Sequence, residues 1–183
     1  MAHSIVVLVG SLRKESHTRK IARAVERVTP GLAFTHVEIR DLALYNEDLD
    51  ATPPAAWTTL RDALGKADGY LFATPEYNRS IPGALKNAID VGSRPAGKSS
   101  FGGKKPAAII SVTPYSLGGF GANHHLRQAL MYLDLAVLAQ PEMYISNAGK
   151  LLDAEGEFAN DDTKPHFTKF GAAFTAWVQH HAK

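Results

Sequence analysis

The stretch SIVVLVGSLRKESHT, residues 4–18, joins an apolar run to a polar loop. Residues 4–9 do not alternate with polar side chains, which favours a strand covered on both faces of its sheet. Gly10 permits a tight turn after this strand. Beyond the loop, residues 21–28 repeat apolar side chains at helical spacing. The stretch therefore predicts the first strand, loop and helix of an α/β fold.

The rest of the chain repeats these two patterns. Apolar runs expected to form strands cover 70–74, 106–113 and 141–146, and a weaker run at 33–39 alternates as an edge strand does. Helical patterns cover 55–64, 81–90, a stripe in what we expect to be the longest helix (Leu126, Leu130, Leu133, Val137) and a C-terminal stripe (Phe167, Phe170, Phe174, Trp177). This order predicts an α/β, flavodoxin-like fold. Its five-stranded parallel sheet has the order 2-1-3-4-5, with helices on both faces.

Composition limits the classes to which the protein can belong. Its 183 residues, 45% of them hydrophobic, suit a single domain spanning 1–183. A net charge of +2, from 20 basic and 18 acidic side chains, is too balanced for a typical nucleic-acid binder. No apolar run is long enough for a membrane span, and no basic region precedes the first apolar stretch as in a signal peptide. With no cysteine in the chain, we expect a cytoplasmic protein.

In an open parallel sheet, ligands bind beyond the carboxyl ends of the strands, where the strand order reverses. For this order the reversal lies between the first and third strands. Loops 10–18, 74–80 and 111–121 should therefore converge on one crevice. We expect no metal there: adjacent His124 and His125 point in different directions on a helix, and no HExxH motif accompanies them.

The first loop has the chemistry of an anion site. Ser11, Ser16 and Thr18 offer hydroxyl groups, and Arg13 can make paired, charge-assisted contacts to phosphate oxygens. The helix that follows adds free N–H groups and a partial positive charge. The alternative is that Ser16 or Thr18 only caps this helix and Arg13 is solvated. A Walker motif and a GxGxxG fingerprint are both absent, so a mononucleotide phosphate remains open.

The second and third loops suit a planar ligand, although each has a structural alternative. Tyr77 offers a flat ring and Asn78 a donor and an acceptor, but Asn78 could instead cap the next helix. In the third loop, Gly118, Gly119 and Gly121 permit either close approach to a ligand or a flexible lid. No GxSxG nucleophile motif and no cysteine support a hydrolase.

Together, GSLRKES and PEYNRSIPGALKNAID (75–90) resemble the NAD(P)H-dependent FMN reductase family, which includes quinone, chromate and azo reductases. The resemblance implies FMN as cofactor, NADPH or NADH as co-substrate, and a homodimer or homotetramer. It also implies a ping-pong reaction that needs no catalytic side chain of the protein. The residues implied to bind the cofactor are Ser11, Arg13, Ser16, His17, Thr18, Pro75, Glu76, Tyr77, Asn78, Ser111, Thr113, Gly118 and Gly119.

Two positions depart from the family pattern. Thr18 stands where the family usually has asparagine, and Gly121 stands where several relatives carry an arginine that ties subunits together. The resemblance leaves open the electron acceptor, the preference between NADH and NADPH, and the oligomeric state. It also leaves two rival functions: a flavodoxin-type electron carrier and a non-enzymatic flavin-binding regulator.

Overall fold

The computed structural model describes residues 2–181, and its elements alternate between strands and helices as expected. The strands are β1 (His3–Val9), β2 (Leu32–Val37), β3 (Gly69–Thr74), β4 (Pro106–Val112), β5 (Ala136–Val137) and β6 (Met143–Ile145). The helices are α1 (His17–Arg27), α2 (Ala55–Lys66), α3 (Gly83–Ser93), α4 (Phe120–Tyr132) and α5 (Lys164–His181), with short 3₁₀ turns η1 (Glu47–Leu49) and η2 (Ala148–Lys150).

All strand pairs are parallel, and the order β2-β1-β3-β4-β5 confirms the predicted sheet. The predicted fifth strand is divided in two. β5 pairs with the first residues of β4, and β6 pairs with its last three. Pro141 lies between the two pieces, and proline has no N–H to donate to a sheet.

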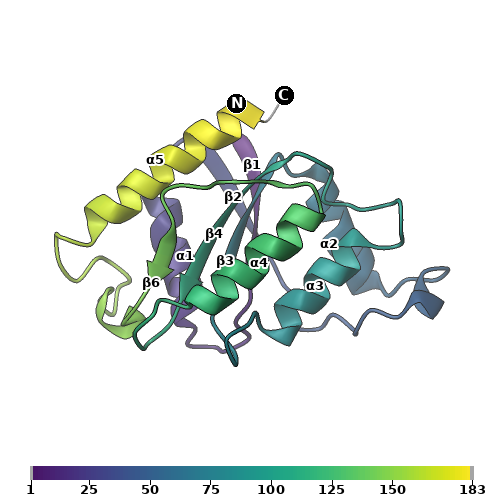
Figure 1. Cartoon of the computed structure of the whole chain (residues 1–183), viewed down its shortest axis with the longest axis horizontal. Coiled ribbons are helices and arrows are strands. Elements are labelled where there is room, and N and C mark those ends of the chain that lie inside the picture. The colour runs from purple at the N-terminus through teal and green to yellow at the C-terminus, as the bar shows by residue number, and fades with distance from the viewer. Residues whose placement is uncertain (1, 182–183) are drawn as a thin grey trace.

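Helices cover both faces of the sheet (Figure 1). α1 and α5 bury one apolar cluster against the sheet, around Val7, Leu71 and Phe174. α2, α3 and α4 bury a second cluster on the other face, around Leu8, Phe72 and Leu126. Because β1 and β3 are buried on both faces, their apolar runs carry no alternation.

Two predictions about the helices were wrong. The stripe through Leu126 does not reach Val137, because α4 ends at Tyr132 and the left-handed backbone of Asp134 (φ 58°) turns the chain into β5. α4 is also not the longest helix, since α5 has 18 residues against its 13. Within residues 2–181, no helix combines the length and apolarity that crossing a membrane requires.

Candidate functional site

The loops that follow β1, β3 and β4 lie at one edge of the sheet, the lower edge in Figure 1. The first and second loops touch: a Cβ placed on Gly10 would lie 3.3 Å from the Pro75 side chain. The second and third are joined by the Glu76 carboxylate, which accepts a hydrogen bond from the Ala122 N–H at 3.1 Å. The structure thus brings together the three segments that the sequence singles out.

In the first loop, several donors have no partner. Ser11 and Thr18 are buried residues, yet their hydroxyl groups make no hydrogen bond with any other residue in the range 2–181. Arg13 is exposed and likewise makes no hydrogen bond to the described residues. Ser16 caps α1, because its hydroxyl oxygen accepts from the Arg19 N–H at 3.1 Å. The N–H groups of the first helical turn have no acceptor inside the helix, so the loop presents donors suited to an anion.

His17 connects this loop to a segment that the sequence did not implicate. A Cβ placed on Gly149 would lie 3.3 Å from the His17 ring, so η2 packs against the start of α1. The backbone N–H of Ala148 donates to the Thr113 carbonyl at 3.1 Å, which joins η2 to the third loop as well. These contacts lie more than 30 residues apart in the chain, and no local motif could have indicated them.

The second loop ends in a tight hairpin turn. Tyr77 and Ser80 exchange two backbone hydrogen bonds, at 2.9 and 3.0 Å, around Asn78 and Arg79. Both central residues have left-handed backbone, with φ of 52° and 64°, as a type I′ turn requires. Asn78 therefore does not cap α3, whose N-cap is Pro82.

The second half of the motif PEYNRSIPGALKNAID has a structural role. Asn87 is buried on α3, and its side-chain oxygen accepts from the Tyr45 N–H at 2.8 Å. Its amide nitrogen donates to the carbonyls of Leu42 and Ala43. Asn87 therefore anchors the long connection between β2 and α2, and we assign it no contact with a ligand.

The third loop is fixed from below by Ser111. Its buried hydroxyl donates to the Gly118 carbonyl at 2.7 Å and accepts from the Asn123 amide at 3.2 Å. Gly118 and Gly119 have positive φ, and a Cβ on Gly118 would lie 2.6 Å from the backbone of Tyr144. Glycine is therefore required at 118 by both conformation and space, which favours a fixed loop over a flexible lid.

The sequence reasoning missed two apolar side chains on the same loop. Tyr115 is 77% exposed and Leu117 is 61% exposed, beside the buried glycines. Leu117 also has a left-handed backbone, with φ of 72°, which is rare for a bulky residue. Two large apolar residues inside a Gly-rich loop were the pattern that could have indicated them.

Comparison with known proteins identifies the family. A family model of NADPH-dependent FMN reductases matches residues 3–150. A quinone reductase of Pseudomonas putida is 51% identical over 179 residues, which are 97% of this chain and 95% of that protein. The chain belongs to the NADPH-dependent FMN reductase family. It is therefore an oxidoreductase of a family that uses FMN and NAD(P)H, as the resemblance implied.

Further members extend this match along the whole chain. A 2-hydroxy-1,4-benzoquinone reductase of a Burkholderia species is 42% identical over 180 residues, 98% of each chain. Among solved structures, FerB, a flavoenzyme NAD(P)H:(acceptor) oxidoreductase from Paracoccus denitrificans, has a TM-score of 0.94 and 36% identity and is covered completely. This likeness confirms the flavodoxin-like fold of the FMN reductase.

The histidines and tyrosine beside the loops are engaged with each other. His124 Nε2 lies 3.1 Å from the Tyr144 hydroxyl, and His125 Nδ1 lies 2.9 Å from the Ser80 hydroxyl. Burial raises the pKa of Tyr144 to about 12, so its phenol stays protonated at neutral pH. No cluster of three or more His, Cys, Asp or Glu suited to a metal ion occurs between residues 2 and 181.

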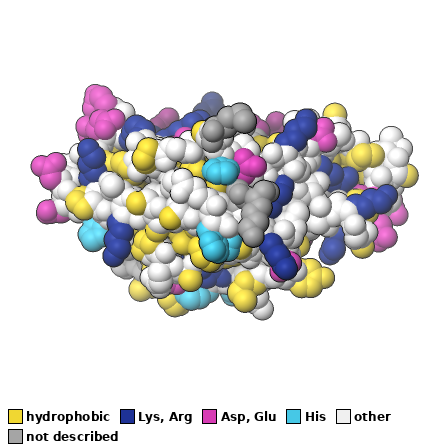
Figure 2. Space-filling model, turned by 90° about the horizontal axis from the view of Figure 1, so that it is seen from above, with side chains coloured by type: hydrophobic (Ala, Val, Ile, Leu, Met, Phe, Trp, Pro, Cys, Tyr) yellow, Lys and Arg dark blue, Asp and Glu magenta, His cyan; other side chains and the backbone are white. Residues whose placement is uncertain are grey.

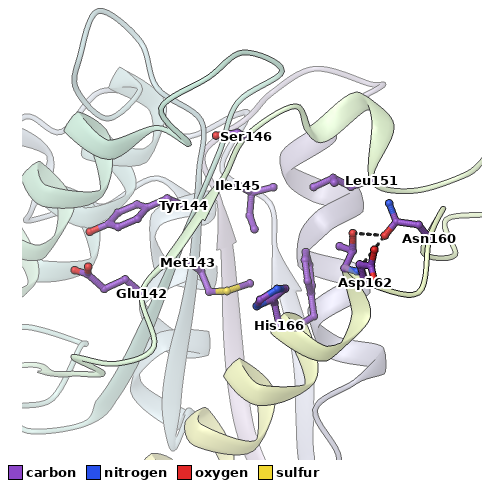
Figure 3. Close-up of a pocket in the computed structure, with 11 residues that line it drawn as sticks. Glu142, Met143, Tyr144, Ile145, Ser146, Leu151, Asn160, Asp162 and His166 are labelled. Carbon is purple, nitrogen blue, oxygen red and sulfur yellow. Dashed lines mark hydrogen bonds between the residues drawn. The ribbon is translucent and has the colours of Figure 1, made fainter.

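A cavity of this FMN reductase borders the third loop, because its lining residues Tyr144 and Ile145 contact Gly118 and Thr113. Its volume is about 470 Å³, and it opens between β6 and the start of α5 (Figure 3). Met143 and Ile145 lie on its apolar wall and Asn160 lies at its rim. Phe167 also lines it. None of the residues expected to bind the cofactor lines this cavity.

The opposite end of the molecule, where the strands begin, carries mixed charges. Basic and acidic side chains are interspersed over the face in Figure 2. Polar groups at this end pair with one another: Asp68 accepts from both the backbone N–H and the hydroxyl of Ser4, at 2.7 and 3.0 Å. Ser4 and Asp68 are thus bonded to each other, whereas several donors of the first loop have no partner among residues 2–181.

Proposed function

We propose that this FMN reductase oxidises NAD(P)H and reduces quinones by a ping-pong reaction on bound FMN. Two relatives, at 51% and 42% identity, carry names that specify quinone substrates. The observation that carries the proposal is the set of donors in the first loop, where Ser11, Arg13 and Thr18 make no hydrogen bond within residues 2–181. A phosphate monoester matches this set in charge and in hydrogen-bond demand.

The residues divide into two groups around the proposed cofactor. The phosphate would be held by side chains and N–H groups at the start of α1, namely Ser11, Arg13, Ser16, His17 and Thr18. The ribityl chain and the ring would contact the other two loops, through Pro75, Glu76, Tyr77, Asn78, Ser111, Thr113, Gly118 and Gly119. Because the Ser111 hydroxyl already bonds the Gly118 carbonyl and the Glu76 carboxylate already bonds the Ala122 N–H on α4, these two would act mainly through the backbone they fix.

Bound FMN would supply the two-electron chemistry: it would take up a hydride from the nicotinamide and, after the oxidised nucleotide leaves, return a hydride to the quinone, with a proton from solvent completing the hydroquinone. The protein's own residues bind and orient both partners. Tyr77, half exposed at the tip of the second loop, and Leu117, on the third, would border the space above the ring. We assign no nucleophile or general acid to the protein.

The test is to purify the protein and record its flavin spectrum without oxygen. The proposal expects a yellow protein that NADPH or NADH bleaches and that a benzoquinone restores. Initial rates with both nucleotides, over quinone, chromate, azo and free-flavin acceptors, then identify the preferred pair. If the flavin binds but NADPH and NADH do not bleach it, the protein would be an electron carrier or a flavin-binding regulator and not this enzyme. A colourless protein that retains no added FMN would end the flavin assignment.

We also propose that the protein is a homodimer or a homotetramer. A groove of about 700 Å³ runs between α3 and α4 and is lined by apolar residues such as Ile81, Ile89 and Leu133. Tyr132 borders the groove, and Met131 beside it on α4 is also strongly exposed, which is unusual for a face in contact with water only. Light scattering, with and without FMN, measures the mass.

A cytoplasmic location remains a prediction.

A further inference from the structure

Glu76 joins the two loops that face the proposed flavin ring, although 46 residues separate it from its partner. Its side chain is only 13% exposed. One carboxylate oxygen accepts from the Ala122 N–H on α4 at 3.1 Å, and the other accepts from the Arg79 guanidinium at 3.2 Å. One acidic side chain therefore contacts both the tip of the second loop and the helix that follows the third.

The start of α4 depends on this carboxylate. The N-cap of α4 is Gly119, which has no side chain to bond the free N–H groups of the first turn. Glu76 supplies an acceptor from outside the helix, and its charge lies at the positive end of the helix dipole. The turn 77–80 is thereby held against α4, and the contact between Ser80 and His125 adds a second tether.

Gly121 makes this close contact possible. A Cβ at this position would lie 2.6 Å from the Arg79 carbonyl oxygen and 3.1 Å from a Glu76 carboxylate oxygen. The backbone of the turn therefore rests directly on the first turn of α4. Arg79 itself has a left-handed backbone, a conformation that persists in such a residue only when its surroundings enforce it.

We propose that Glu76 is a positioning residue that sets the orientation of the Tyr77–Asn78 backbone toward the flavin ring. The inference rests on the proposed function and assigns a role to a carboxylate that does not itself react. Both of its oxygens are occupied by the protein, so it acts through the turn. Loss of the carboxylate removes one attachment of the turn to α4, so the peptide groups that would meet the ring are held less firmly in their direction.

The test measures FMN affinity and the midpoint potential of the bound flavin in Glu76→Ala and Glu76→Gln. Glutamine can still accept from the Ala122 N–H but does not carry the charge that holds Arg79. We expect Glu76→Ala to raise the Kd for FMN about tenfold, the scale of one lost hydrogen bond to a charged group. Its potential should also shift, and Glu76→Gln should recover most of the affinity. Glu155→Ala, in an exposed loop, is the matched control.

A role in folding alone would give a different result. Glu76→Ala would then unfold at a lower temperature, while its FMN Kd and its potential matched those of the parent chain, and the inference would be overturned. If Glu76→Ala does not fold, Arg79→Ala cuts one of the two bonds and should raise the Kd by a smaller factor. An unchanged Kd and potential in Arg79→Ala would also overturn it.

Gly121→Ala tests the same contact from the other side. The added methyl group should displace the turn and raise the FMN Kd, whereas Gly65→Ala, with nothing within 4 Å of its Cβ, should not. Both substitutions break the same contact between the turn and α4. The double variant Glu76→Ala/Gly121→Ala should therefore lose less FMN-binding free energy than the sum of the two single losses. Strict additivity would contradict the inference. A parent chain that binds no FMN would instead refute the proposed function.

Discussion

The first loop and the two loops that face the ring border the same crevice but differ in their hydrogen bonding. In the first loop, the hydroxyls of Ser11 and Thr18 and the guanidinium of Arg13 have no hydrogen-bond partner among the described residues. In the other two, Glu76 and Ser111 bond the neighbouring loop or helix. Binding groups are therefore free where an anion is expected, and they form a fixed frame where a flat ring is expected.

The largest expected effect is on FMN affinity, and it should follow the loss of the Arg13 side chain. Arg13→Ala removes a charge-assisted contact to phosphate and should weaken FMN binding by about 1.5–3 kcal/mol, roughly ten- to a hundredfold in Kd. Fluorescence titration with FMN measures the Kd. Lys14→Ala, which removes the adjacent exposed cation, is the control and should change it less than about threefold. Equal losses in both variants would mean that net charge, and not this arginine, holds the ligand.

Substitutions in the third loop should instead lower the stability of the fold. Gly118→Ala forces a Cβ against the Tyr144 backbone in a left-handed conformation and should lower the free energy of unfolding by about 1–3 kcal/mol. Gly97 also has a positive φ but has nothing within 4 Å of its Cβ, so Gly97→Ala isolates the conformational part. Urea unfolding of the apoprotein compares the variants. Arg13→Ala should stay within about 0.5 kcal/mol of the parent chain, and a larger loss there would remove the contrast between the regions.

The smallest effect should come from the far end of the sheet. The hydrogen bond from the Ser4 N–H lowers the pKa of Asp68 from its usual value. A lowered folded-state pKa stabilises the protein above the unfolded pKa, and this stabilisation is lost as pH falls through the folded value. Asp68→Asn should therefore flatten the loss of stability below about pH 4, by less than about 1 kcal/mol. Thermal unfolding against pH measures it, and a change in FMN affinity at neutral pH would contradict the separation of the two ends.

Sequence pattern predicted what depends on neighbouring residues. The strand order follows from the alternation of elements, and Ser16 was recognised as one of two candidate caps because capping acts over three residues. The pattern failed where contacts between distant residues determine the ends of an element. The end of α4 before Val137 depends on the pairing of β5 with β4, and the divided fifth strand on Pro141.

The same limit applied to the candidate site. The motif indicated Glu76, but its bond to Ala122 spans 46 residues and appears only in the folded chain. Ser111 was expected at the ligand, and its role in fixing Gly118 and Asn123 required the positions of β4 and α4. The predicted strand order thus indicated which loops meet, and the structure was needed to separate free groups from occupied ones.

The most direct test of the central claim compares FMN with riboflavin, which has the same ring and ribityl chain but no phosphate. If the free donors of the first loop bind the phosphate, the parent chain should bind FMN at least about tenfold more tightly than riboflavin. Arg13→Ala should reduce this ratio by about tenfold or more and leave the riboflavin Kd nearly unchanged. Equal affinity of the parent chain for the two flavins would contradict the account.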